Sequence, residues 1–118
     1  MVMQWIMMAG ALAALAQGQS ERGELSERLS SPPKATFDTA KKPYDLEICL
    51  ADALTIVGVP SVFRNGPENV VFAVSYAGGN AVLSTLSVDR TDAGSHLTLR
   101  TRGKGYDDRL IGRIRGCL

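Results

Sequence analysis

The chain has two cysteines, and each lies within an apolar pattern of helical spacing, which links two segments that are far apart in the sequence. Apolar residues that recur every three or four positions form one face of a helix. The first such pattern is Leu46, Cys49, Leu50, Ala53, Leu54 and Val57, and the second is Tyr106, Leu110, Ile114 and Cys117. Both cysteines are therefore expected on buried helix faces, where the two side chains can meet.

The residues that flank both patterns are typical of helix ends. Pro43 suits the first position of a helix, where its missing N–H is not needed, and Gly58 suits the left-handed conformation after the last turn. Asp107 and Asp108 open the second pattern and Arg113 follows near its end, the order that the helix dipole favours. The sequence predicts one helix from Pro43 to about residue 57 and another from Asp107 to the C-terminal residues.

Between these helices, the spacing of apolar residues changes from helical to alternating. Alternation places successive side chains on opposite faces of a strand. Four strands are predicted, over residues 59–63, 70–76, 81–89 and 96–100. Short turns separate them, with a strong hairpin signal at 77–80, and short turns require antiparallel neighbours. The predicted fold class is α+β: a two-layer α-ββββ-α sandwich, whose antiparallel meander sheet carries the N- and C-terminal helices on one face.

The N-terminal segment differs from the rest of the chain, because residues 1–16 carry no charged side chain. A helix of this length is too short to span a bilayer, and Ala14-Leu15-Ala16 supplies the small residues that signal peptidase requires. We therefore expect a signal peptide, with a short buried helix or an uncleaved anchor as alternatives. Residues 17–42 are expected to form a polar linker or loosely ordered arm, and residues 43–118 the α+β domain. No transmembrane segment is expected in the mature chain.

Export would place the cysteines in an oxidising compartment, periplasmic or extracellular, where disulfides persist. A Cys49–Cys117 disulfide is therefore expected, with a pair of buried free thiols as the alternative. Asn65, Asn69 and Asn80 are not followed by Ser or Thr at the second position, so no glycosylation sequon indicates a eukaryotic secretory route. The bacterial periplasm is the favoured compartment.

His96 is the only histidine, so every His-dependent catalytic site would have to use it. Alternation places His96, with Thr98 and Arg100, on the face of the sheet turned away from the helices. A flat, solvated face lacks the cleft that excludes water from a reaction. Two cysteines and one histidine are also too few for a zinc site. No catalytic residue, metal or cofactor is predicted, although a small periplasmic enzyme or enzyme inhibitor that uses the open face around His96 is the alternative function.

A run of basic residues near the C-terminus is the most distinctive surface feature. The whole chain has a net charge of only +1, from 13 Lys and Arg against 12 Asp and Glu. The run comprises Arg100, Arg102, Lys104, Arg109, Arg113 and Arg115. It lacks the aromatic side chains on which bases stack, so no nucleic-acid partner is expected. An acidic protein or an anionic envelope component fits the run, and ordinary solvated arginines are the alternative.

These patterns describe a fold and a compartment better than an activity. The favoured hypothesis is a small exported, disulfide-closed domain that acts as a non-catalytic binding or interaction module. The candidate binding residues are His96, Thr98 and Arg100 on the open sheet face, and Arg109 and Arg113 on the C-terminal helix.

Overall fold

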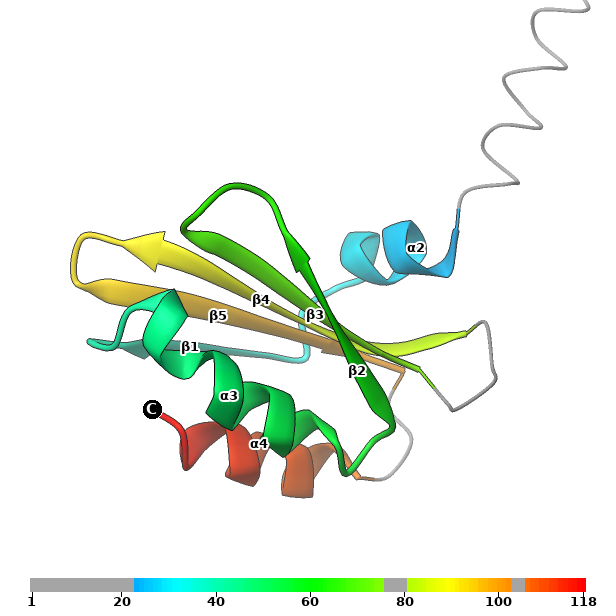
Figure 1. The fold of residues 1–118 in the computed structure, drawn as a ribbon. Helices are drawn as coiled ribbons and strands as arrows, with labels where there is room; N and C mark the ends of the chain where they lie inside the picture. Colours follow the sequence, from blue (N-terminus) through cyan, green and yellow to red (C-terminus); the bar gives the residue numbers. More distant parts are fainter. Residues whose placement is uncertain (1–22, 76–80, 103–105) are drawn as a thin grey trace, which may run out of the picture.

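The computed structural model describes residues 23–75, 81–102 and 106–118, which form one antiparallel sheet and three helices (Figure 1). The elements are α2 (Glu24–Ser30), β1 (Ala35–Thr39), α3 (Pro43–Leu54), β2 (Val59–Arg64), β3 (Asn69–Ser75), β4 (Val82–Thr91), β5 (Gly94–Thr101) and α4 (Asp107–Arg115). The predicted α+β class is confirmed. The expected signal peptide at 1–16, the hairpin turn at 77–80 and Lys104 lie outside the described residues.

The described sheet has five strands in the order β1-β5-β4-β3-β2, one more than the sequence pattern predicted. Strands β2 to β5 form the expected meander, in which each strand pairs with the next. The additional strand is β1, which pairs antiparallel with β5 so that Phe37 lies opposite Leu97. It lies within residues 17–42, the segment expected to be a polar linker or arm, and so does α2. These two elements extend the folded part of the chain N-terminally beyond Pro43.

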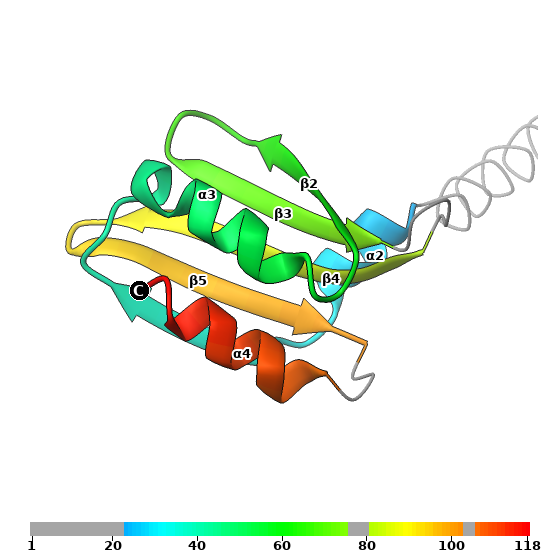
Figure 2. The same ribbon diagram turned by 60° about the horizontal axis from the view of Figure 1, so that its bottom comes forward.

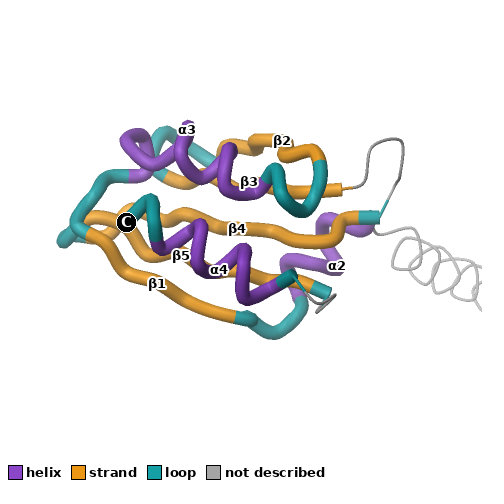
Figure 3. Tube along the Cα trace, turned by 90° about the horizontal axis from the view of Figure 1, so that it is seen from below, coloured by secondary structure: helices purple, strands orange, loops and turns teal. Residues whose placement is uncertain are grey.

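The two predicted helices, α3 and α4, lie on one face of the sheet as expected, and the additional helix α2 lies on the other face (Figure 1 and Figure 2). Figure 1 shows α3 and α4 below the sheet and α2 above it, and Figure 3 shows α3 and α4 in front when the sheet is seen from below. Arg28 attaches α2 to the sheet, because its Nε donates a hydrogen bond to the backbone oxygen of Val82 at 3.2 Å. Thr85, which lies opposite Arg100 on this second face, is fully buried.

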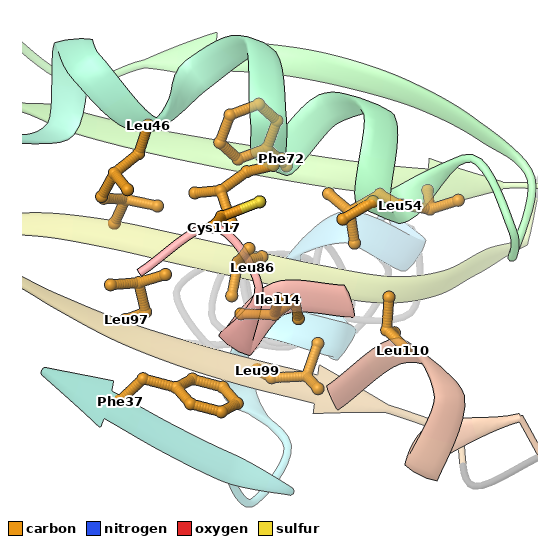
Figure 4. Packing of buried hydrophobic residues seen from close by; sticks show 14 of the residues in the cluster. Phe37, Leu46, Leu54, Phe72, Leu86, Leu97, Leu99, Leu110, Ile114 and Cys117 are labelled. Carbon is orange, nitrogen blue, oxygen red and sulfur yellow. The ribbon is translucent and has the colours of Figure 1, made fainter. Parts of the chain in front are cut away.

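The hydrophobic core lies between the sheet and the pair α3 and α4, which run side by side across one face (Figure 2). Figure 4 shows its side chains converging from both layers. The fully buried leucines come from α3, α4 and the two central strands β4 and β5, and they are Leu46, Leu50, Leu54, Leu86, Leu97, Leu99 and Leu110. Burial of a leucine side chain contributes about 1.5–3 kcal/mol, so this layer is the main source of stability.

The predicted disulfide is confirmed: Cys49 and Cys117 are bonded, with their Cα atoms 5.7 Å apart. The expectation that both cysteines lie on buried faces is only half right, because Cys117 is buried and Cys49 is exposed. Cys49 lies at the edge of its helical stripe, whose centre, Leu46 and Leu50, packs onto the sheet. From that edge it reaches sideways to the end of α4, so the bridge joins the two helices along their outer flank.

One backbone feature and one side-chain hydrogen bond fix the two ends of β5. Gly94 begins β5 with a φ of 149°, and a Cβ there would overlap the Thr39 carbonyl oxygen and lie 2.6 Å from the Ala40 carbonyl carbon. Only glycine has no Cβ to meet this close approach of β1. At the other end of β5, Thr101 Oγ1 donates to Asp107 Oδ2 at 2.9 Å, which ties the first turn of α4 to the sheet.

Candidate functional site

The predicted binding residues fall on two surfaces that the sheet separates. His96, Thr98 and Arg100 alternate along β5 with the buried Leu97 and Leu99, so they lie on the face away from α3 and α4. We call these three residues the open-face cluster. Arg109 and Arg113 lie on α4, on the opposite side of the sheet, and are called the α4 arginine pair. The structure therefore does not bring the two groups together.

His96 has a carboxylate partner that the sequence pattern missed. Its Nδ1 lies 2.8 Å from Asp38 Oδ1, because β1 places Asp38 directly opposite His96. Asp89 of β4 is its cross-strand neighbour on the other side. Both members of the pair are accessible, with side chains 39% and 81% exposed. An aspartate can orient an imidazole in this way for general base catalysis. Within the described residues, however, no serine, threonine or cysteine side chain bonds to the imidazole.

The other two members of the open-face cluster have structural surroundings. Arg100 Nε donates to the Ser31 backbone oxygen at 2.9 Å, just after α2. Its neighbour Arg102 forms an ion pair with Glu24 of α2 at 3.1 Å. These two arginines therefore fasten α2 to the end of the sheet. Thr98 is half-buried between its cross-strand neighbours Thr36 and Ser87.

The α4 arginine pair differs from the other arginines that the structure describes. Arg109 and Arg113 are exposed, and neither has a hydrogen bond, ion pair or ring contact with another described residue. The remaining described arginines all have one, and they are Arg28, Arg64, Arg90, Arg100, Arg102 and Arg115. Arg115, for example, lies over the Phe37 ring at 5.9 Å from its centroid. The basic run thus contains only two described arginines without a partner.

The surroundings of the α4 arginine pair are open. The residues are four positions apart, which places them on the same side of the helix, about 6 Å apart along its axis. Gly112 lies between them, and a Cβ there would meet nothing within 4 Å. Arg113 also lines a hollow of about 230 Å³ beside the disulfide, together with Asp52. Two guanidinium groups therefore project from a low, accessible surface.

A third surface was not predicted and lies along α3 and β2. In the part of the chain that the structure describes, every large hydrophobic side chain that remains exposed belongs to one of these two elements. These side chains are Tyr44 (78%), Ile48 (88%), Val59 (53%), Val62 (46%) and Phe63 (47%). We call this surface the α3–β2 edge. The sequence contains one indication of this surface: Val62 and Phe63 are consecutive apolar residues, whereas a strand with only one buried face would alternate apolar and polar residues there.

The α3–β2 edge contains a hollow of about 550 Å³ between the helix and the edge strand. Ile48, Ala51, Val62 and Phe72 line it, and an ion pair between Arg64 and Glu47, with nitrogen and oxygen 2.6 Å apart, also borders it. The hydrogen bond and the negative charge of Glu47 raise the pKa of Arg64. The wall of the hollow is therefore mainly apolar, and the Arg64–Glu47 ion pair at its border carries no net charge.

The described residues offer no site for a metal ion, because no three His, Cys, Asp or Glu side chains gather closely enough to hold one. None of the helices described there is long and apolar enough to cross a membrane. Comparisons of the chain with family models, with curated proteins and with solved structures find no match. Function must therefore be argued from the surfaces themselves.

Proposed function

We propose that the protein is an exported, non-catalytic binding module whose α4 arginine pair engages an anionic partner, an acidic protein or an anionic envelope component. The observation that carries this proposal is the absence of any described partner for Arg109 and Arg113, while the other described arginines are engaged. Guanidinium groups bind carboxylates and phosphates through paired hydrogen bonds, and exposed ones are free to do so.

The local charge supports this role. The first turn of α4 has two acidic residues, but Asp107 is buried and accepts a hydrogen bond from Thr101. Only Asp108 is exposed in that turn, before the helix presents Arg109, Arg113 and Arg115 to solvent. The outer surface of α4 is therefore cationic although the chain is almost neutral overall, with a net charge of +1.

Two independent features support export. The disulfide is the kind of bond that persists in the periplasm or outside the cell and is rare in the cytosol. The uncharged segment at residues 1–16, which ends in Ala14-Leu15-Ala16, fits a signal peptide. N-terminal sequencing of the protein from its own host should begin at Gln17 or Ala14. Recovery of protein that retains Met1 from the cytoplasm would contradict export.

Binding to two anionic probes tests the α4 arginine pair. One probe is a lipid vesicle containing phosphatidylglycerol, and the other is a polyglutamate peptide; neutral phosphatidylcholine vesicles are the blank. A basic side chain near an anionic surface contributes about 1 kcal/mol, so reversal of both charges should weaken binding at least about thirtyfold. Binding of the wild type should also weaken as salt rises, because exposed charges are screened.

The test variant carries both Arg109→Glu and Arg113→Glu. A second variant carries Arg113→Glu alone, and its control is Arg90→Glu, which makes the same charge reversal on β4. Arg90→Glu should bind both probes like the wild type. The probe that binds identifies the class of partner, lipid phosphate or protein carboxylate. Salt-independent binding, equal binding by all variants, or no binding to either probe would contradict the proposal.

The His96–Asp38 contact favours a second candidate function, a small periplasmic enzyme or enzyme inhibitor that acts through the open sheet face. If His96 serves as a general base, an activated ester such as p-nitrophenyl acetate should be hydrolysed, and both His96→Ala and Asp38→Asn should reduce the rate in folded protein. Thr36→Ala on the same strand is the control and should leave the rate unchanged. If the wild type hydrolyses the ester and His96→Ala does not, the protein is an enzyme rather than a binding module, whether or not Asp38→Asn also loses the activity.

A further inference from the structure

The exposed apolar side chains of the α3–β2 edge lie on both faces of β2. Val62 faces the α3 side, where it lines a hollow with Ile48 and Ala51. Phe63 faces the opposite side, where it lines a smaller hollow of about 130 Å³ with Leu25 of α2. Val59 shares the side of Phe63, because residues two apart on a strand share a face. An occupant that contacts both sides must therefore lie along the edge of the strand.

The backbone of β2 presents a free edge for such an occupant. β2 is the last strand of the described sheet and pairs only with β3. Asn65 N donates to the Asn69 oxygen at 3.2 Å, and hydrogen-bonded positions then alternate along the antiparallel pair. Phe63, Ser61 and Val59 therefore bond towards β3, and Arg64, Val62 and Pro60 point outward. Pro60 fits this register because it has no N–H to leave unpaired.

We propose that a second copy of this chain occupies the α3–β2 edge, with the two β2 strands paired antiparallel about Val62. In this register, Val62 lies opposite Val62 of the second copy and each exchanges both backbone hydrogen bonds. The Arg64 N–H points at the carbonyl oxygen of Pro60 in the second copy. The two copies form one continuous sheet, and Ile48 and Tyr44 of each face those of the other across the dimer axis.

Self-pairing satisfies the chemistry of this edge better than other registers do. A shift of two residues in either direction places Pro60 opposite Val62, which removes a central donor, or pairs the strand with Gly66 in the turn. The last turn of α3 has no basic residue near the negative end of its dipole. The register about Val62 brings Arg64 of the second copy beside Pro60 near that end, where it keeps its ion pair with Glu47 of its own chain. The net charge of +1 per chain leaves little repulsion between copies.

Sedimentation velocity over a range of concentrations tests the dimer, and the sample is the mature protein purified from its own host. We expect the mass of two chains at about 100 µM and dissociation on dilution towards about 1 µM, the range of a modest interface. Ile48→Glu places a charge in the apolar contact and should weaken dimerisation at least about tenfold. Val62→Pro removes the outward donor without touching the β2–β3 bonds and should do the same. Thr36→Glu, an exposed position on β1 at the opposite edge, is the matched control.

Cysteine cross-linking tests the register separately, because only a residue on the dimer axis lies opposite the same residue of the second copy. Val62→Cys should form an intermolecular disulfide on mild oxidation, since Cα atoms of such a pair are about 5.5 Å apart. Ser61→Cys lies opposite Phe63 of the second copy and should cross-link much more slowly. A wild-type chain that stays monomeric at about 100 µM, dimers that persist in both edge variants, or equal cross-linking at positions 61 and 62 would overturn the proposal. The α4 arginine pair takes no part in this interface, so the loss of probe binding on reversal of Arg109 and Arg113 is expected whether or not the chain dimerises.

Discussion

Removal of the disulfide is the change whose effect on stability can be worked out most directly. The bridge joins residues separated by 68 positions, and closing a loop of that size in the unfolded chain lowers its entropy enough to stabilise the fold by about 4 kcal/mol. Domains of this size are stable by about 5–15 kcal/mol, so the bridge supplies a large share. Cys49→Ser is the preferred variant because Cys49 is exposed. Its hydroxyl is hydrated in both states, and the loss then reports the cross-link.

Urea unfolding followed by circular dichroism measures this loss. Cys49→Ser should lower the free energy of unfolding by about 4 kcal/mol, and wild-type protein with its bridge reduced should match the variant within about 1 kcal/mol. Cys117→Ser should be worse than Cys49→Ser, because it buries a hydroxyl where Cys117 is 3% exposed. A loss below about 1 kcal/mol, or a reduced wild type as stable as the oxidised protein, would refute the entropic argument.

Two pairs of substitutions test the fold, and in each pair the structure tolerates one change and not the other. Gly94→Ala should cost about 2–4 kcal/mol, because its Cβ would overlap the Thr39 carbonyl at a φ of 149°; Gly66→Ala, at a φ of 93° in open space, should cost only about 1 kcal/mol. Leu99→Ala should cost about 2–5 kcal/mol because Leu99 is fully buried, whereas Ile48→Ala should change stability by less than about 0.5 kcal/mol. Chemical unfolding at low protein concentration, where self-association does not contribute, checks both pairs, and equal losses within either pair would contradict the packing described.

The sequence was informative wherever a local pattern determined the outcome. The helical spacing from Leu46 to Leu54 predicted the side of α3 that packs on the sheet, and alternation in β5 predicted which residues face away from the core. The same patterns predicted the meander of β2 to β5, because short turns allow only antiparallel neighbours. Cys49 was misjudged because a residue at the edge of a stripe can bond sideways to a neighbouring helix.

The features that sequence reasoning missed depend on contacts between distant segments. Asp38 could not be recognised from the sequence as the partner of His96, because only the pairing of β1 with β5 places the two side by side. Arg100 was predicted as a binding residue, but its side chain donates a hydrogen bond to the backbone of Ser31, directly after α2. Arg109 and Arg113 were identified from the sequence as basic residues, but their lack of a described partner is known only from the structure. Partner choice among charged side chains is a tertiary property that composition does not encode.

Strand β1 tests where the folded domain begins. Its five residues contain one large apolar side chain, Phe37, which is 7% exposed in the core and lies under the guanidinium of Arg115. If β1 is part of the cooperative fold, Phe37→Ala should lower the free energy of unfolding by about 3–5 kcal/mol. Tyr44→Ala is the matched control, since Tyr44 is also aromatic but 78% exposed, and it should change stability by less than about 0.5 kcal/mol. Both are measured by urea unfolding at low protein concentration, where self-association does not contribute. Equal and small effects would mean that the segment is an arm resting on β5, and that the domain begins at α3 as its sequence pattern predicted.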